Sequence, residues 1–549
     1  MVVEIVAVVV GLVALTAMVR AGARRIGVPD PIALLVVGAA VSWVPGVPPL
    51  RIDPDLVLVV LLPLLLYGAA FAASLPAFRR HIRPILLLSV GLTIVSALAV
   101  GVVASAVVPG LGFAAACALG AAVAPPDAVA ATAVARGIRM PRRVVALLEG
   151  ESLFNDAAAL TVLTVAVGAA TGGSLSFAEA TGQFLLSAVG GLVIGGLAAV
   201  AVAWVRRRVL NPYTDVVVFL VAPFAAFLPA EVVGASGLVA VVITGLYLGH
   251  RATTIMDPGA RVVTGSVRTA LSWLLEGVVF LLVGLELREV VAGLASTPLR
   301  VVVVSAVSVV ITLIVVRVVW LALTEQAAPA AVGRRRASWG ESTLTAWAGM
   351  RGAVSLAAVL TLPLVVPDGR AFPQRDLIVF LTFVVIVATL LGQGLTLPLL
   401  ARRLVGGDSE AAAEARQEAQ ARLEAADAAM ARLEEMHRDA PGGEEIVDQL
   451  RRRVQNRVRA ADEQLAAIDT EARADTADSD PRAYLEPRRA PDTGQQELPR
   501  DTYRRFGQAM IVAERARLLA LRDQGRLGED GFVRIQRELD LEQAALLVR

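Results

Sequence analysis

The 549-residue chain contains no lysine, one cysteine and few aromatic residues. All 51 basic residues are arginine, and because they do not form one basic patch, the missing lysine gives no sign of nucleic-acid binding. A single cysteine, Cys117, excludes a disulfide framework and a cysteine metal cluster. No ATP-binding motif is present, which excludes nucleotide hydrolysis as an energy source.

Charge is also scarce and unevenly distributed, with 18% charged against 56% hydrophobic residues. Residues 1–403 are almost entirely Val, Leu, Ala, Gly and Ile, in runs of the ~20 residues that cross the ~30 Å core of a bilayer. Residues 404–549 are rich in Glu, Asp, Arg, Ala and Gln. We therefore predict a membrane domain over 1–403 and a soluble tail over 404–549.

The apolar runs between turn signals predict thirteen membrane-spanning helices. The first has neither a basic n-region nor a cleavage site, so it is predicted to be a span and not a removed signal peptide. With the N-terminus outside, the inside loops hold 21 arginines and the outside loops 5, which predicts a cytoplasmic tail. The predicted spans lie near residues 2–19, 30–47, 54–75, 84–108, 112–135, 145–171, 182–205, 214–230, 234–249, 268–288, 299–323, 342–364 and 376–401.

A first unusual polar group lies in the fifth span, "LGAAVAPPDAVAATAVA". A carboxylate such as Asp127 costs several kcal/mol in a bilayer, so it suggests function. Pro125 and Pro126 have no N–H, so the carbonyls of Ala121 and Ala122 lose their helical donors. Free carbonyls beside a carboxylate suit a hard cation. The alternative is a proline kink whose acid pairs with an arginine.

A second group lies at 149–160, "EGESLFNDAAAL", at the start of the sixth span. On a helix Ser152 and Asp156 share one face, while Glu151 and Asn155 share the neighbouring face. The first face is predicted to meet a cation, and Glu151 is predicted to be structural. A buried ion pair is the alternative for Asp156.

A third group lies in the twelfth span, residues 345–363, "TAWAGMRGAVSLAAVLTLP". Arg351 stands between Gly349 and Gly352, small residues that permit close helix approach or local unwinding. An arginine this deep needs a carboxylate partner. Binding of an anionic substrate is the alternative.

Several of these segments resemble sodium/proton exchangers of the monovalent cation:proton antiporter-1 family, which includes the NhaP-type proteins. "EGESLFND" resembles the family's G-E-S-L-x-N-D, and "GMRGAVSLAAVLTLP" its G-x-R-G-A-x-S-L. Two weaker matches are "LLPLLLYGAAF" (61–71) and "FLLVGLELR" (280–288). With thirteen spans, the resemblance covers essentially all of 1–403.

The resemblance implies an all-α polytopic membrane protein with two inverted repeats, helices 1–6 and 8–13. The fifth and twelfth helices would be broken and cross at the midplane, and exchange would proceed by alternating access. The chain would be a homodimer in the plasma membrane that transports Na⁺ and H⁺ for pH and sodium homeostasis. It would not be an enzyme and would need no cofactor.

The resemblance also implies roles for individual residues. Asp156 would be the principal ion and proton carboxylate, Asp127 its companion, and Ser152 an oxygen ligand of Na⁺. Asn155 stands where electrogenic relatives carry a second aspartate, which implies electroneutral exchange of one cation for one proton. Glu151 would pair with Arg351 as a structural brace.

Two departures from the family pattern leave the transported cation open. Pro126-Asp127-Ala128 replaces the usual Thr-Asp-Pro, and Gly68 stands where some relatives carry an acid. K⁺/H⁺ exchange is therefore an alternative to Na⁺/H⁺ exchange. A gated cation channel is an alternative from another class, disfavoured by acids on broken helices and by the absence of a filter-like loop.

The tail is predicted to be mostly helical and partly disordered. Residues 408–437 have high helix propensity and i,i+4 charge pairs, and a second helix follows Pro441-Gly-Gly443 through about 469. Residues 471–500 are polar and contain proline, which predicts disorder. Residues 528–547 have apolar positions at helical spacing and are predicted to pack on a partner or on the tail. Regulation, dimerisation and a passive extension are all open as roles.

Overall fold

A computed structural model describes residues 2–45, 56–127, 131, 140–172, 177–209, 211–294, 297–327, 338–366, 369–404, 407–439, 444–474 and 500–548. Within these ranges the chain is helical, apart from one isolated bridge between Val365 and Ala371. The chain forms two compact units. The first comprises Met1–Ile255 and Thr264–Val405, and the second Met256–Val263 and Gly406–Arg549.

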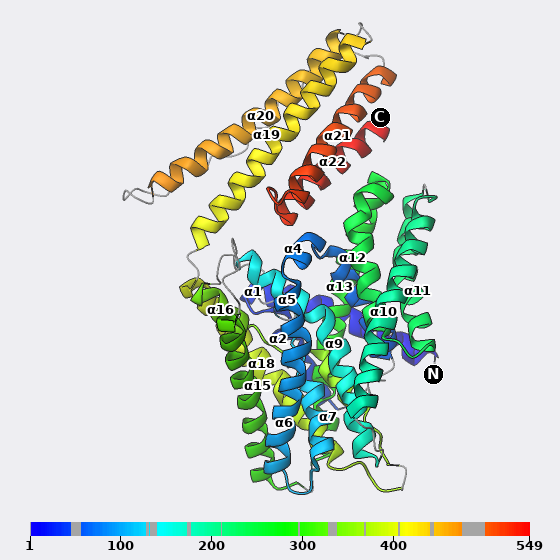
Figure 1. Cartoon of the computed structure of the whole chain (residues 1–549), viewed down its shortest axis with the longest axis vertical. Helices are drawn as coiled ribbons and strands as arrows, with labels where there is room; N and C mark the ends of the chain where they lie inside the picture. The colour runs from blue at the N-terminus through cyan, green and yellow to red at the C-terminus, as the bar shows by residue number, and fades with distance from the viewer. Residues whose placement is uncertain are drawn as a thin grey trace. The chain divides into compact units, whose positions relative to one another are not determined.

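Every range that the sequence predicts as a span contains helix (Figure 1). Nine of the described helices are long and apolar enough to cross a membrane, so the all-helical membrane fold is confirmed, while the count of thirteen spans stays a prediction. The elements are α1 (Val2–Ile26), α2 (Asp30–Ser42), η1 (Leu56–Leu61), α3 (Leu62–Ala72), α4 (Leu75–Arg80), α5 (Ile82–Leu86), η2 (Leu87–Leu92), α6 (Thr93–Val107), α7 (Phe113–Val123), α9 (Arg142–Ala170), α10 (Phe177–Arg206), α11 (Pro212–Val232), α12 (Gly237–Ile255), α13 (Pro258–Leu285), α14 (Leu287–Ala292), α15 (Leu299–Ala327), α16 (Trp339–Trp347), α17 (Ala353–Leu360) and α18 (Arg375–Leu404).

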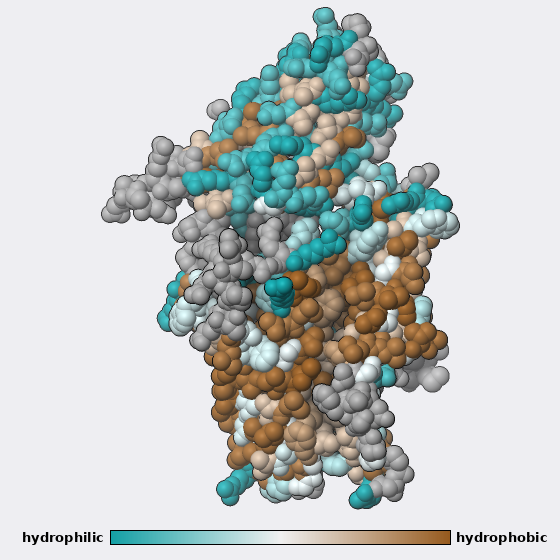
Figure 2. All heavy atoms as spheres, in the orientation of Figure 1, coloured by the Kyte–Doolittle hydropathy of each residue, from teal (hydrophilic) through white to brown (hydrophobic). Residues whose placement is uncertain are grey.

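Apolar side chains cover much of the outside of the first unit. On α15, Val303, Val307, Ile311 and Val315 recur every four residues and are 50–54% exposed. Figure 2 shows such hydrophobic residues massed over the helices of this unit. An apolar stripe of this length would be unfavourable in water, so it indicates a surface covered by lipid.

Regular helix stops inside two of the predicted spans of the first unit. Helix α7 ends at Val123, with Ala124 between it and the two prolines, and the segment 348–352 separates α16 from α17. Pro125 and Pro126 remove the next two backbone donors, which explains the first break. The break expected in the twelfth span is confirmed. In the fifth span the first half is confirmed to end before the prolines, while residues 128–130 and 132–139 lie outside the described residues.

The second unit contains the helices α19 (Gly407–Asp439), α20 (Glu444–Ala474), α21 (Arg500–Asp523) and α22 (Glu529–Val548). Three of them were expected from the sequence, whereas α21 was not. Leu518, Phe532 and Leu539 are buried in one apolar cluster of this unit, and Leu433 and Leu450 in another. The predicted disorder over 471–500 falls mainly on residues 475–499, outside the described residues.

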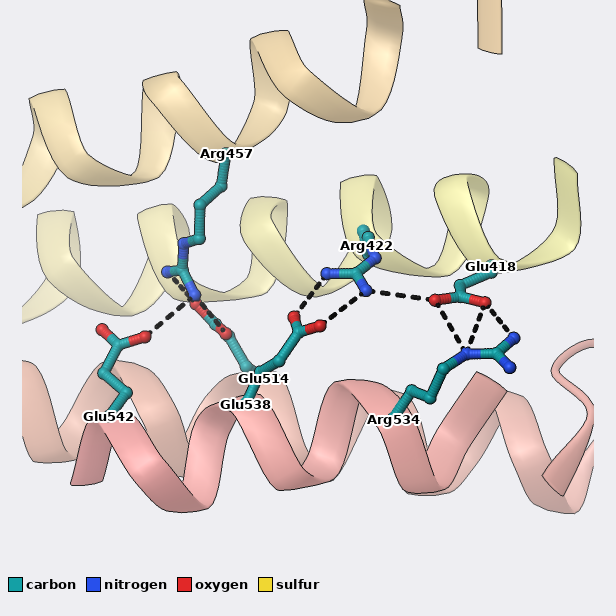
Figure 3. Close-up of polar contacts among 7 residues, drawn as sticks. All are labelled: Glu418, Arg422, Arg457, Glu514, Arg534, Glu538 and Glu542. Carbon is teal, nitrogen blue, oxygen red and sulfur yellow. Dashed lines mark hydrogen bonds and ion pairs between the residues drawn. The ribbon is translucent and has the colours of Figure 1, made fainter. Parts of the chain in front are cut away.

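Ion pairs join the helices of the second unit (Figure 3). Arg422 of α19 bonds to Glu538 of α22, and Arg534 of α22 bonds to Glu418 of α19. Arg457 of α20 bonds to Glu514 of α21. Because several of these charges contact more than one partner, they form networks, which stabilise more than isolated surface pairs do.

Candidate functional site

The two interrupted helices meet at Asp127. Its main-chain N–H donates to the carbonyl of Met350 at 2.7 Å, which joins the two extended segments directly. Its carboxylate lies against Gly352, the residue that precedes α17, and a Cβ at Gly352 would collide with Oδ2 of Asp127. A negative charge is favoured there because the N-terminal end of a helix carries partial positive charge.

Asp156 lines a small cavity next to this crossing. Its side chain is 6% exposed, and Asp127 is near enough for its charge to act on the Asp156 carboxyl. The other walls are small or apolar, so the carboxylate dominates the chemistry of the cavity. They are Ala121, Ala122, Pro125, Ala159, Leu160, Leu163, Val354 and Ala358. The structure thus brings Asp156 together with the end of α7, where Ala121 and Ala122 lack helical donors.

Asn155 ties α9 to the unwound stretch. Its Nδ2 donates to the carbonyl of Pro126 at 2.7 Å, and its side chain is fully buried. This bond satisfies one backbone carbonyl in the interrupted region and fixes the distance between the segment that carries Asp127 and the helix that carries Asp156. Asn155 therefore has a positioning contact that its sequence pattern did not indicate.

Ser152 lies one turn before Asp156 on α9 and is partly exposed. It is not among the residues that line the cavity around Asp156. Its role as a ligand of the ion therefore stays a prediction based on the family resemblance.

The predicted ion pair between Glu151 and Arg351 is wrong. Glu151 accepts two bonds from Arg317 of α15, at 2.6 Å from Nη1 to Oε1 and 2.8 Å from Nη2 to Oε2. Both side chains are at most 1% exposed. The paired N–H groups of a guanidinium match the two oxygens of a carboxylate, and this geometry favours a single arginine as partner. The sequence shows both arginines and cannot tell which of them points at Glu151.

Arg351 instead caps the broken end of α7. Its Nε donates to the carbonyl of Val123 at 2.9 Å and its Nη2 to that of Ala124 at 3.3 Å, while Nη1 donates to the carbonyl of Gly349. The last carbonyls of a helix have no helical donors and carry partial negative charge. A guanidinium satisfies both requirements, so Arg351 is a backbone clamp.

The end of α16 is bound by an arginine in the same way. Arg317 donates to the carbonyl of Thr345 from Nε at 3.3 Å and from Nη2 at 3.1 Å, in addition to its pair with Glu151. A Cβ at Gly349 would lie 2.7 Å from Cδ and Nε of Arg317, so glycine is needed where the two arginines pass. The C-terminal carbonyls of α7 and α16 thus each accept hydrogen bonds from an arginine, Arg351 and Arg317 respectively.

Helices that break and cross beside a buried carboxylate are typical of ion-coupled secondary transporters. The chain belongs to the family described as "Sodium/hydrogen exchanger, transmembrane", which matches residues 11–403. The family resemblance inferred from the motifs is therefore confirmed.

Individual relatives extend this result. An uncharacterised Na⁺/H⁺ exchanger of Escherichia coli strain K12 is 30% identical over 550 residues, covering 95% of this chain and 94% of its own length. A sodium, potassium, lithium and rubidium/H⁺ antiporter of Bacillus pumilus is 29% identical, covering 68% of this chain and 58% of its own length. The solved structure of the sodium proton antiporter MjNhaP1 from Methanocaldococcus jannaschii has a TM-score of 0.59 at 21% identity, covering 74% of this chain and 99% of its own.

Proposed function

We propose that the protein exchanges cytoplasmic Na⁺, or Li⁺, for protons by alternating access, with one cation moved per proton. The observation that carries this proposal is the Asp156 carboxylate in a small cavity beside the crossing of two interrupted helices. A transported ion must enter and leave from both sides in turn, and a site at the junction of two half-helices suits such a cycle.

Protons and cations compete for the same carboxylates, and this competition couples the flux of one to the flux of the other. Asp156 binds either a proton or the cation, with Asp127 and Ser152 adding oxygens for the cation. An unoccupied site carries a negative charge, which is unfavourable in the membrane interior. The protein therefore changes readily between its outward-open and inward-open states only when a proton or a cation occupies the site. Asn155 is neutral and adds no further charge, which favours electroneutral exchange. Transport is then expected not to respond to an imposed membrane potential.

The proposed cellular setting rests on the charge distribution and on the family resemblance. The protein is proposed to lie in the plasma membrane as a homodimer, with the N-terminus outside and residues 404–549 forming a cytoplasmic tail. It would serve pH and sodium homeostasis.

K⁺/H⁺ exchange is the second candidate. The name of the Bacillus pumilus relative includes potassium and rubidium among its ions. Pro126 also stands where the family usually has threonine. Loss of that hydroxyl changes the oxygens near the ion, and the radius of the preferred cation depends on them.

The test is a proton-flux assay in vesicles that contain the purified protein, with Na⁺, Li⁺ and K⁺ added separately. Cation-dependent proton flux with Na⁺ or Li⁺ supports the proposal, flux with K⁺ alone supports the second candidate, and no flux with any cation overturns both. Cation flux without proton counterflow indicates a channel. Asp156→Asn should abolish exchange, whereas Asp376→Asn, at an exposed acid in the first turn of α18, should preserve it.

A further inference from the structure

Three hydroxyl side chains lie in a row on one face of η2 and α6. Ser89, Thr93 and Ser96 follow one another at spacings of four and three residues and are at most 1% exposed. None of the three hydroxyl oxygens has a hydrogen-bond partner within the part of the chain that the structure describes. A buried hydroxyl without a partner is unfavourable by about 1–3 kcal/mol, so three in a row require an explanation.

Several other hydroxyls in this unit bond to their own helix, although the buried hydroxyls of Thr16 and Tyr67 also have no partner among the described residues. Thr161 donates to the carbonyl of Ala157 at 2.8 Å, Thr382 to that of Ile378 at 3.0 Å, and Thr389 to that of Val385 at 2.8 Å. This back-bonding to the preceding turn is the usual solution for serine and threonine in an apolar helix. The three hydroxyls of η2 and α6 make no such bond, so their donors and acceptors remain available to a water molecule.

The register of α6 against α7 is fixed by two close contacts. Ala97 packs on Gly120, where a Cβ would collide with its carbonyl, and Cys117 packs on Gly101. Residue numbers rise on one helix as they fall on the other, so the two helices are antiparallel (Figure 1).

This register places the hydroxyl row at the depth of the ion site. Thr93 is one turn before Ala97 and therefore lies level with Ala124, at the broken end of α7. Two residues further, Pro126 accepts the bond from Asn155, the neighbour of Asp156. The row of hydroxyls therefore lies beside the end of α7, at about the depth of the Asp156 carboxylate.

A fourth oxygen without a partner belongs to the same region. Oδ1 of Asn155 is buried and makes no hydrogen bond to any described residue. Helix α9 packs on both η2 and α6. On the far side, η2 is covered by α15, because Trp320 donates from Nε1 to the carbonyl of Leu87 at 3.1 Å. The polar row is therefore enclosed between α7, α9 and α15.

We propose that Ser89, Thr93, Ser96 and Asn155 bind a file of internal water molecules that conducts protons to and from Asp156. Hydroxyls both donate and accept, and internal water bonds to buried polar groups that lack other partners. These four oxygens include no carboxylate, whereas the proposed cation site has Asp156 and Asp127, so we assign water and not the cation to the hydroxyl row. In each transfer an oxygen accepts one proton and releases another, so the file itself keeps no charge. A π-helical segment such as η2 is frequently found at functional positions.

This inference rests on the proposed antiport at Asp156. The test compares the wild type with the triple variant Ser89→Ala, Thr93→Val, Ser96→Ala, in which the hydroxyls are lost and the volumes are nearly kept. The matched control is Ser105→Ala, on the same helix, because the Ser105 hydroxyl is exposed and bonds to the carbonyl of Val102. Proton flux at saturating Na⁺ should fall several-fold in the triple variant and stay unchanged in the control. Na⁺ binding to the folded state raises the melting temperature. This increase should be equal in the wild type, the triple variant and the control, because the three hydroxyls are not proposed to bind Na⁺.

Unchanged proton flux in a folded triple variant would overturn the conducting role. If the triple variant does not fold, Thr93→Ser and Thr93→Val replace it: the serine variant should retain flux and the valine variant should lose it. A high-resolution cryo-electron microscopy map of the wild type tests the water file independently of transport. Water density within hydrogen-bond distance of Ser89, Thr93 and Ser96 supports it, and hydroxyls turned back onto their own helix carbonyls overturn it. A wild type without any proton flux would overturn the antiport proposal and leave the map as the test of the water file.

Discussion

The Asp127 carboxylate fills the space that a side chain at Gly352 would need. Gly352 has φ −124° and ψ −165°, a conformation that any residue can adopt, so glycine is required for space and not for backbone freedom. The close approach lets the acid of one interrupted helix lie at the start of the second half of the other. A single methyl group is enough to test this relationship.

Gly352→Ala is expected to abolish or strongly reduce exchange. The new methyl group must displace the Asp127 carboxylate or separate the Asp127 N–H from the Met350 carbonyl. The measurement is cation-dependent proton flux in vesicles at equal protein density. Gly392→Ala is the control, because nothing lies within 4 Å of a Cβ at that helical position. Full activity of Gly352→Ala would contradict the observed crossing.

Glu151→Gln is expected to destabilise the protein by about 3–5 kcal/mol, because removal of one partner leaves the other charge buried and uncompensated. The partner is Arg317, and the pair is inaccessible to solvent. Thermal unfolding in detergent measures the effect. Glu435→Gln removes an exposed pair with Arg432 and is expected to change stability by less than about 1 kcal/mol.

The identity of the partner of Glu151 can be tested separately. Combining Glu151→Gln with Arg317→Gln should cost much less than the sum of the two single changes, because both remove the same pair. Combining Glu151→Gln with Arg351→Gln should be closer to additive, since Arg351 bonds to the carbonyls at the end of α7. Strong coupling in the second pair and none in the first would restore the arrangement expected from the sequence.

Asn155→Asp is expected to lower stability as well as to add a charge. The aspartate cannot donate to the Pro126 carbonyl, and loss of a buried bond costs about 1–3 kcal/mol. The variant should therefore unfold at a lower temperature than the wild type. Asn211→Asp is the control, because Asn211 caps α11 by accepting a bond from the N–H of Tyr213, which aspartate also does. A normal melting temperature for Asn155→Asp would mean that the bond to Pro126 contributes little.

The tail is expected to loosen as the pH falls. Burial would raise the pKa of Glu418, but hydrogen bonds and charge from Arg534 and Arg422 outweigh it and lower that pKa below the usual value of 4.5. A carboxyl whose pKa is lower in the folded state adds stability above its unfolded pKa, and this stability is lost as pH falls through the folded pKa.

Hydrogen exchange over α19 and α22, corrected for intrinsic rates, measures this effect. Protection should be constant from pH 7 to about 5 and fall below about 4.5, the usual pKa of Glu418. Glu418→Gln should lower protection already at pH 7. Equal protection in the two proteins at neutral pH would contradict a stabilising role for this carboxylate.

The sequence determined the class of fold and indicated the residues of the candidate site. Apolar runs of membrane length, the bias of arginines and the buried acids follow from the chemistry of single segments in a bilayer, so they can be recognised without contacts. The break in α7 follows in the same way, because Pro125 and Pro126 lack N–H groups wherever they lie.

The tertiary structure alone decided which groups meet. Arg317 and Arg351 are both arginines in apolar segments, and only the tertiary structure, in which Arg317 of α15 reaches Glu151 of α9, shows which of them is the partner. Arg351 is left to bind the carbonyls that the break in α7 exposes. The Asn155 bond to Pro126 and the position of Asp127 on Gly352 also depend on register between helices far apart in sequence. Residue type and spacing specify what a side chain can bond to, whereas the partner is chosen by the rotation and depth of the helix that faces it.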